Sequence, residues 1–282
     1  MADETPAALI NGVAADPRSG TIAPLDRGFQ YGDGVFETLA AVGGEGRDVD
    51  AHLARLARGA QLLGIPEPDS DRIREELYRL APEQGRAVLK VLYTRGIGGR
   101  GLAPPAEAAP TRVVLRLPWP DQPPEWWQEG VRAITCHTRQ VSGEALDGRI
   151  KHMNRLGQIR ARMEWTDPGI AEGLLRDDAG WMVEGTVTNI LRVRDGRLET
   201  PAMGSAGLAG ITRDRILTLA RERGTPTVTK PLTRSDLFDA DELGLTNSLV
   251  GLWPVRELDG EPIAAPGPVL GALQQALEAS YG

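Results

Sequence analysis

A proline-rich stretch near the middle of the chain constrains the fold more than any other feature. Residues Pro118–Trp127 read PWPDQPPEWW and contain four prolines. Each proline fixes φ and removes a backbone donor, so helices and sheets are interrupted there. The sequence therefore predicts a smaller N-terminal domain over residues 1–117, a linker over 118–127 and a larger C-terminal domain over 128–282.

Both halves mix helical and strand patterns. The spacing of apolar residues predicts helices over 50–64, 69–80, 152–165, 211–224 and 268–280, and strands over 87–93, 112–117 and 131–137. Two hairpins are expected, with turns at 178–180 and 195–196. Strands precede helices in the C-terminal half instead of alternating with them, which predicts an α+β fold, not a doubly wound parallel sheet.

Composition narrows the class of protein. The 282 residues carry a net charge of −7 and are 41% hydrophobic, which is typical of a globular enzyme and does not favour nucleic acid as a partner. No apolar run is long enough to span a membrane, and the N-terminus lacks the pattern of a signal peptide. Cys136 is the only cysteine and the three histidines are dispersed, so we expect no disulfide and no metal site. These observations favour a cytoplasmic protein.

Lysine is rare, which limits the candidates for an amine nucleophile. The three lysines are Lys90, Lys151 and Lys230. Lys151 precedes an amphipathic segment, and Arg149 and Arg155 are close enough in sequence to depress its pKa. A surface lysine at a helix start fits the same pattern.

Three segments of the C-terminal half could bind a phosphorylated cofactor. Glu184 lies in an apolar strand, where a carboxylate needs a partner such as a pyridinium nitrogen, unless the strand is an edge facing water. The segment Gly207–Arg213 places two glycines before a helix whose first turn holds Thr212, a pattern that fits either a phosphate cradle or a simple helix cap. Thr246–Ser248 interrupts an apolar strand, as a bulge or as a ligand contact.

The N-terminal half offers arginines that could bind anions. Arg55 lies between Leu53 and Leu56 and could bind a phosphate, or could extend over the surface. Arg95 and Arg100, in the glycine-rich stretch 94–101, could hold a substrate carboxylate. The glycine-rich pieces 26–39 and 94–101 are equally consistent with turns.

The order and spacing of these segments resemble the class IV aminotransferase family, the fold-type IV enzymes that use pyridoxal 5′-phosphate (PLP). The resemblance is carried by Tyr31–Glu37, by Arg55 with Leu56, by Lys151, by Glu184 with Asn189, by Gly210–Arg213, and by Asn247 and Ser248 followed by Pro254 and Val255.

The resemblance implies a two-domain homodimer with an N-terminal α/β sandwich, a larger C-terminal pseudo-barrel and PLP between the domains. It implies that Lys151 forms a Schiff base with PLP and that Glu184 faces the pyridine nitrogen. The cofactor-binding residues that it implies are Arg55, Lys151, Arg155, Glu184, Asn189, Leu208, Gly210, Ile211, Thr212, Asn247 and Ser248.

Within the family, the chain is most similar to the 4-amino-4-deoxychorismate lyases. Arg155 stands where many branched-chain aminotransferases carry a tyrosine, and the arginine loop lacks the Arg-x-His pair typical of D-amino-acid aminotransferases. This implies conversion of aminodeoxychorismate to 4-aminobenzoate and pyruvate, a step of folate precursor synthesis, with Lys151 and Thr38 as catalytic residues and Tyr31, Arg95 and Arg100 as substrate-binding residues. An aminotransferase for D-amino acids, branched-chain amino acids or amines is the alternative.

Overall fold

The computed structural model describes residues 7–140, 150–202, 206–263 and 266–281. The chain divides into two compact units, residues 1–121 with 150–154, and residues 122–149 with 155–282. The division falls inside the proline-rich segment predicted as a linker. Part of that segment is itself ordered, because Trp126 and Trp127 of helix α4 (Glu125–Gln128) pack edge-on against Trp253.

The first unit is built on a six-stranded antiparallel sheet in the order β2-β1-β6-β5-β3-β4. Its strands are β1 (Ala7–Ile10), β2 (Val13–Ala15), β3 (Gly34–Val42), β4 (Glu45–Gly46), β5 (Arg86–Thr94) and β6 (Thr111–Pro118). Its helices are α1 (Arg27–Tyr31), α2 (Val49–Leu62) and α3 (Ser70–Leu80).

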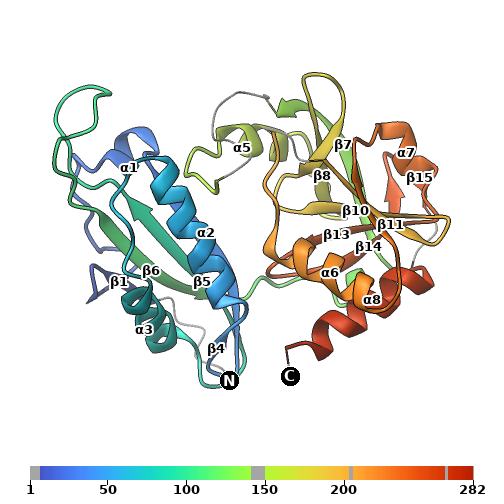
Figure 1. Ribbon diagram of the computed structural model, residues 1–282, viewed down its shortest axis with the longest axis horizontal. Helices are drawn as coiled ribbons and strands as arrows, with labels where there is room; N and C mark the ends of the chain where they lie inside the picture. Colours follow the sequence, from blue (N-terminus) through green and yellow to red (C-terminus); the bar gives the residue numbers. More distant parts are fainter. Residues whose placement is uncertain (1–6, 141–149, 203–205, 264–265, 282) are drawn as a thin grey trace. The chain divides into compact units, whose positions relative to one another are not determined.

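Helices α2 and α3 cover one face of this sheet (Figure 1). The alternation of β3 sends Val35, Leu39 and Ala41 to that face, where they join the core with Leu56 and Leu77. The predicted helices at 50–64 and 69–80 and the predicted strands at 87–93 and 112–117 are confirmed to within a few residues.

The second unit holds a larger mixed sheet in the order β12-β11-β10-β13-β14-β7-β8-β9, with β15 paired to β14. Its strands are β7 (Val131–Gln140), β8 (Ile170–Asp177), β9 (Met182–Gly185), β10 (Asn189–Arg194), β11 (Arg197–Pro201), β12 (Thr227–Lys230), β13 (Glu242–Asn247), β14 (Gly251–Leu258) and β15 (Glu261–Pro262). Strand β9, at one end of the order, contacts β10 and β11, so the sheet curls back on itself as expected for a pseudo-barrel.

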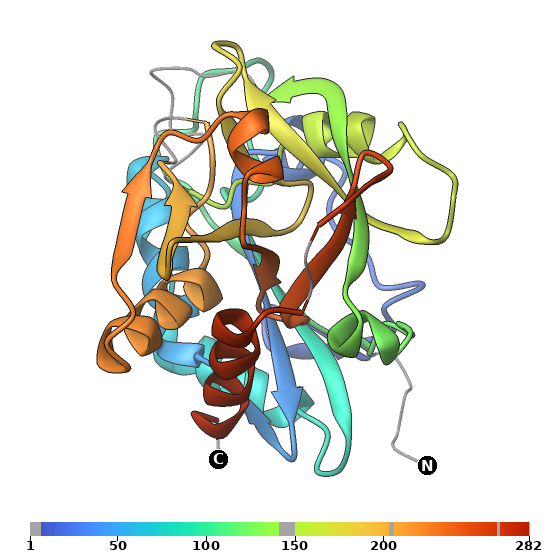
Figure 2. The ribbon, with the colours of Figure 1, turned by 90° about the vertical axis from the view of Figure 1, so that its right-hand side faces the viewer.

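Besides α4, the described part of this unit contains the helices α5 (Leu156–Arg162), α6 (Ile211–Glu222), α7 (Arg234–Phe238) and α8 (Pro268–Ala279). Helices α6 and α8 lie side by side in both views (Figures 1 and 2) and bury Leu217 and Leu273 in a common core. Both predicted hairpins are present, and the β10–β11 turn uses Asp195 and Gly196 at positive φ, as a type I′ turn requires.

The predicted helix over 152–165 is wrong at its start. Residues 150–154 instead run antiparallel along the edge of β3, where Phe36 donates to the Lys151 carbonyl at 2.9 Å and Met153 donates to the Gly34 carbonyl at 3.0 Å. Helix α5 begins only at Leu156, and its apolar residues Leu156, Ile159 and Met163 are exposed.

No helix of the described ranges is both long enough and apolar enough to cross a membrane.

Candidate active site

Lys151 is held at the edge of the first unit's sheet. Its neighbour His152 bridges to Val35, and the Phe36 amide donates to the Lys151 carbonyl, so Lys151 and Phe36 face each other across the pair. Opposed residues of an antiparallel pair project to the same face. The Lys151 Nζ accordingly lies 4.7 Å from the centroid of the Phe36 ring. This places a half-buried amine on the sheet face opposite α2 and α3.

Thr38 lies on the same face, two residues along β3 from Phe36. It is half-buried and pairs in register with Lys90 of β5. The structure thus brings Thr38 and Lys151, both predicted to be catalytic, to one face of one sheet.

Arg55 is buried on the helix-covered side. Its Nε and Nη2 donate to the two oxygens of Glu37 at 2.7 Å each, and the His52 ring lies 2.7 Å from the same carboxylate. Burial alone would raise the pKa of Glu37, but the hydrogen bonds from Arg55 and His52 and the charge of Arg55 lower it to about 2. Arg55 is therefore not the surface arginine of the alternative interpretation.

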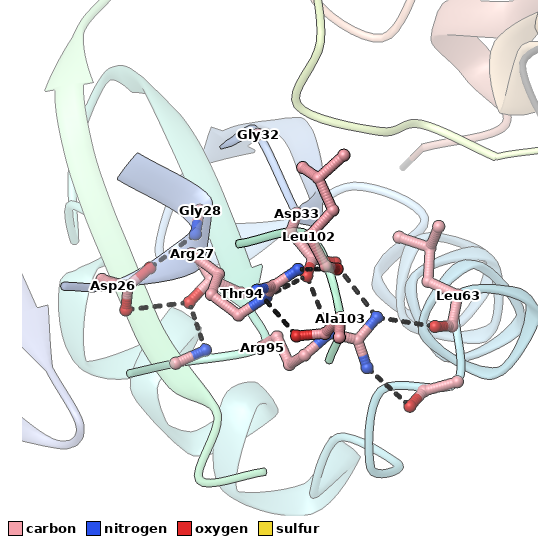
Figure 3. A network of polar contacts seen from close by, with 12 residues as sticks. Asp26, Arg27, Gly28, Gly32, Asp33, Leu63, Thr94, Arg95, Leu102 and Ala103 are labelled. Carbon is pink, nitrogen blue, oxygen red and sulfur yellow. Dashed lines mark hydrogen bonds and ion pairs between the residues drawn. The ribbon is translucent and has the colours of Figure 1, made fainter. Parts of the chain in front are cut away.

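Arg95 lies in a buried polar network, shown in Figure 3. Its guanidinium donates to both oxygens of Asp33 and to the carbonyls of Leu63 and Gly64, at 2.7–3.1 Å. These bonds tie the start of β3, the end of α2 and the end of β5 together. These donors of Arg95 are occupied by the protein, and its role in substrate binding stays a prediction.

Arg27 completes this network and was not singled out by the sequence. It donates to Asp33 and to the carbonyls of Gly101, Leu102 and Ala103 (Figure 3). Arg27 thereby fixes the loop that presents Arg100, whose side chain is exposed. Tyr31, at the end of α1, is also partly exposed, with the Arg27 guanidinium 5.0 Å from its ring centroid.

Glu184 is buried in the second unit, on β9. Its Oε2 accepts a hydrogen bond from the Leu208 amide at 2.9 Å, and the Asn189 side chain donates to the Leu208 carbonyl at 2.9 Å. Leu208 is thus held through both its backbone groups, directly before α6. The interpretation of Glu184 as a water-facing edge residue is wrong, since its exposed fraction is 7%.

The N-terminus of α6 has the features of a phosphate site. Its N-cap is Gly210, which provides no side chain, so the first amides receive no cap. The Thr212 hydroxyl lies 3.4 Å from that of Ser248, which brings two hydroxyl groups to the first turn. A Cβ on Gly210 would lie 2.1 Å from the Asn189 Oδ1, so only glycine fits there. The uncapped amides of Ile211 and Thr212 and the two hydroxyl groups suit the phosphate of PLP.

The side chain of Asn247 binds backbone groups of the protein, and its predicted contact with the cofactor stays a prediction. Its Oδ1 accepts from the amides of Leu249 and Val250, and its Nδ2 donates to the Val187 carbonyl. The side chain therefore forms the turn between β13 and β14, and Ser248 is the residue that this turn presents to α6.

Glu172 of β8 is a buried carboxylate that was not predicted to be important from the sequence. This fully buried carboxylate accepts five hydrogen bonds, from the amides of Gly173, Thr186 and Val187 and from the hydroxyls of Thr186 and Thr188. Burial raises the pKa of Glu172, against the effect of these donors. Glu172 fixes the loop that joins Glu184 to Asn189. The signal was present, because Glu172 interrupts an apolar strand as Glu184 does.

Two remaining expectations concern the neighbours of Lys151. Arg155 is half-buried immediately before α5, and Arg149 lies outside the described residues.

Among the residues that the structure describes, no cluster of histidine, cysteine, aspartate and glutamate could hold a metal ion.

Comparisons with known proteins agree with these features. The model of the amino-transferase class IV family matches residues 34–258. The chain therefore belongs to the class IV aminotransferase family.

Among its relatives, 4-amino-4-deoxychorismate lyase from Pseudomonas aeruginosa has a solved structure that is 42% identical, with a TM-score of 0.89 over 96% of this chain and 98% of that one. A putative branched-chain-amino-acid aminotransferase from Methanocaldococcus jannaschii is 36% identical over 90% of this chain and 88% of its own length. A hypothetical aminotransferase from Mycobacterium tuberculosis, solved in a PLP-bound form, is 25% identical with a TM-score of 0.86, over 97% of this chain and 98% of that one. The fold is that of the fold-type IV enzymes, and PLP is the cofactor.

Proposed function

We propose that this enzyme is a PLP-dependent lyase that converts 4-amino-4-deoxychorismate to 4-aminobenzoate and pyruvate. The observation that carries the proposal is the 42% identity to the Pseudomonas aeruginosa lyase over nearly the whole of both chains. The Arg155 side chain, at a position where many branched-chain aminotransferases have tyrosine, supports it.

The residues described above would bind the cofactor. Lys151 would hold PLP covalently through Nζ, and Glu184, buried and fixed by the Leu208 amide, would accept a hydrogen bond from the pyridine nitrogen. The amides of Ile211 and Thr212, the hydroxyls of Thr212 and Ser248, and the Arg55 guanidinium would bind the phosphate. Asn189 and Leu208 would shape this site through their mutual hydrogen bond.

The chemistry would need one base and one proton donor from the protein. Bound PLP supplies an electron sink next to the substrate carbon that carries the amino group. The Lys151 Nζ would act as the base that takes the proton from that carbon. The Thr38 hydroxyl would then position a proton for the departing enolpyruvyl group. Loss of the enolpyruvyl group leaves an aromatic ring. Protonation of the released enolpyruvate yields pyruvate, and the overall reaction involves no net oxidation or reduction.

Substrate binding and assembly complete the proposal. Tyr31 and Arg100, exposed on the first unit, would contact the carboxylated substrate, while Arg95 stays within its network.

We also propose a cytoplasmic homodimer. The exposed apolar side chains of α5, Leu156, Ile159 and Met163, support the dimer, because such a stripe is more often found at protein contacts than in water.

The direct test is product analysis. The purified enzyme with PLP is incubated with aminodeoxychorismate, and 4-aminobenzoate and pyruvate are measured over time by chromatography. We expect both products in equal amounts. If neither forms above the level of the Lys151→Ala variant, the lyase proposal fails.

An aminotransferase is the second candidate, and the 36% identity to a putative branched-chain-amino-acid aminotransferase favours it. That reaction would transfer the amino group of an amino acid to a 2-oxo acid. The same preparation is therefore mixed with branched-chain or D-amino acids and a 2-oxo acid. Amino-group exchange without 4-aminobenzoate formation would establish this alternative.

A further inference from the structure

Lys90 is a lysine of the first unit that has no role in the function proposed above. It lies in β5, opposite Thr38 of β3, on the sheet face that carries Phe36 and Lys151. The side chain is half-buried, and its Nζ lies 5.2 Å from the centroid of the Phe36 ring. Lys90 and Lys151 thus share one aromatic ring as a neighbour.

Among the residues that the structure describes, no carboxylate forms an ion pair with Lys90. The group that its Nζ contacts there is the apolar ring of Phe36. Desolvation lowers the pKa of Lys90, and no neighbouring carboxylate counteracts this effect. By contrast Lys230, the third lysine, forms an ion pair with Glu199 at 2.9 Å.

We propose that Lys90 binds the ring carboxylate of the substrate and thereby selects carboxylated substrates. A partly desolvated ammonium that lacks a counter-ion gains a charge-assisted hydrogen bond when a carboxylate arrives. The proposal rests on the lyase function proposed above, since that function supplies the substrate.

The geometry suits such a substrate. The Nζ atoms of Lys90 and Lys151 lie 5.2 Å and 4.7 Å from one ring centroid, so their separation is at most the sum of these distances. Aminodeoxychorismate carries its amino group and its ring carboxylate at opposite ends of a six-membered ring. A substrate whose amine engages the cofactor on Lys151 would therefore extend its carboxylate toward a second amine on the same face. Thr38, between the two, faces the same space.

Binding of product-like ligands tests the proposal without relying on turnover. The dissociation constants of 4-aminobenzoate and its neutral amide, 4-aminobenzamide, are measured by titration calorimetry with the PLP-loaded enzyme. We expect the unchanged enzyme to prefer the acid by about tenfold, the value of one hydrogen bond to a charged group. Lys90→Met should abolish this preference by weakening the acid alone, and Lys90→Arg should retain it.

The matched control is Lys230→Met, which removes a lysine of the second unit and should leave the preference unchanged. Retention of PLP absorbance by each variant verifies that it is folded and loaded. A preference for the acid that survives in Lys90→Met would overturn the proposal. So would an unchanged enzyme that binds acid and amide equally or binds neither, or a Lys90→Arg variant that loses the preference as fully as Lys90→Met.

Failure of this inference and failure of the lyase function are distinguishable. If the enzyme forms 4-aminobenzoate from aminodeoxychorismate but its acid preference does not depend on Lys90, only the Lys90 proposal is wrong. If it forms none while the preference depends on Lys90, the lyase function is wrong and Lys90 binds the carboxylate of another substrate.

Discussion

At the scale of single residues, three glutamates in apolar strands have three different environments. Glu37 pairs with Arg55 and His52, Glu184 accepts from the Leu208 amide, and Glu172 accepts five hydrogen bonds from a loop. The sequence signal is the same for all three, a carboxylate among apolar residues. Only Glu184 has a role predicted from the sequence, because the partners of Glu37 and Glu172 come from segments that sequence alone does not bring together.

The buried pair of Glu37 and Arg55 predicts a pH-dependent stability. Glu37→Gln removes the negative charge that faces the buried Arg55 guanidinium, so we expect the free energy of unfolding at pH 7 to fall by about 3–5 kcal/mol. The folded-state pKa of Glu37, about 2, lies below its ordinary value of 4.5. Its ionised form therefore stabilises the fold above pH 4.5, and this contribution is lost as the pH falls from there toward 2.

Urea unfolding of both proteins between pH 7 and pH 3.5 measures this effect. The difference between wild type and Glu37→Gln should be constant down to about pH 5 and should shrink below it. Glu75→Gln, on the exposed face of α3, is the control and should change stability little at any pH. A difference that stays constant or grows in acid would contradict the assignment.

At the scale of elements, the site in the second unit depends on how α6 begins. The helix starts after Gly210, and the Asn189 side chain crosses close to that glycine to reach the Leu208 carbonyl. The sequence predicted that this helix begins near Ile211 and that glycines precede it. It did not predict that Asn189 binds the backbone in front of the helix, or that Asn247 forms a turn while Ser248 approaches Thr212.

Gly210→Ala should disrupt this arrangement. The new Cβ would lie 2.1 Å from the Asn189 Oδ1 and would displace the side chain that holds Leu208. We expect PLP affinity to fall by about tenfold or more, as one charge-assisted hydrogen bond to the phosphate is lost. Equilibrium dialysis of the apoenzyme against PLP measures it.

The control is Gly271→Ala in α8, where a Cβ meets no atom within 4 Å and where alanine favours the helix. An unchanged PLP affinity in Gly210→Ala would show that this glycine does not shape the phosphate site.

Helix α5 shows where periodicity misleads. Leu156, Ile159 and Met163 follow the helical spacing of a buried stripe, yet they are exposed, and the residues that α5 buries are Gln158 and Ala161. The residues before the helix, 150–154, also follow the pattern but form hydrogen bonds to β3. Local spacing could not reveal this, because a strand edge far away in the sequence offers these residues stronger backbone pairing.

At the scale of the whole molecule, Lys151 belongs to a different unit from the one that its position in the sequence indicates. The class of fold follows from the sequence. Lys151, however, was predicted in the C-terminal domain and belongs to the first unit, with Phe36, Thr38 and Lys90 as neighbours. The glutamate and the helix start proposed to bind PLP belong to the second unit. Five residues, 150–154, thus leave the half of the chain in which they stand in sequence and join the other unit.

The attachment site of PLP tests this account most directly. The enzyme loaded with PLP is reduced with borohydride, digested, and mapped by mass spectrometry. With three lysines in the chain, the outcome is unambiguous. We predict that the reduced cofactor is found on the peptide that contains Lys151. Its attachment to Lys90 or Lys230 instead would contradict the account.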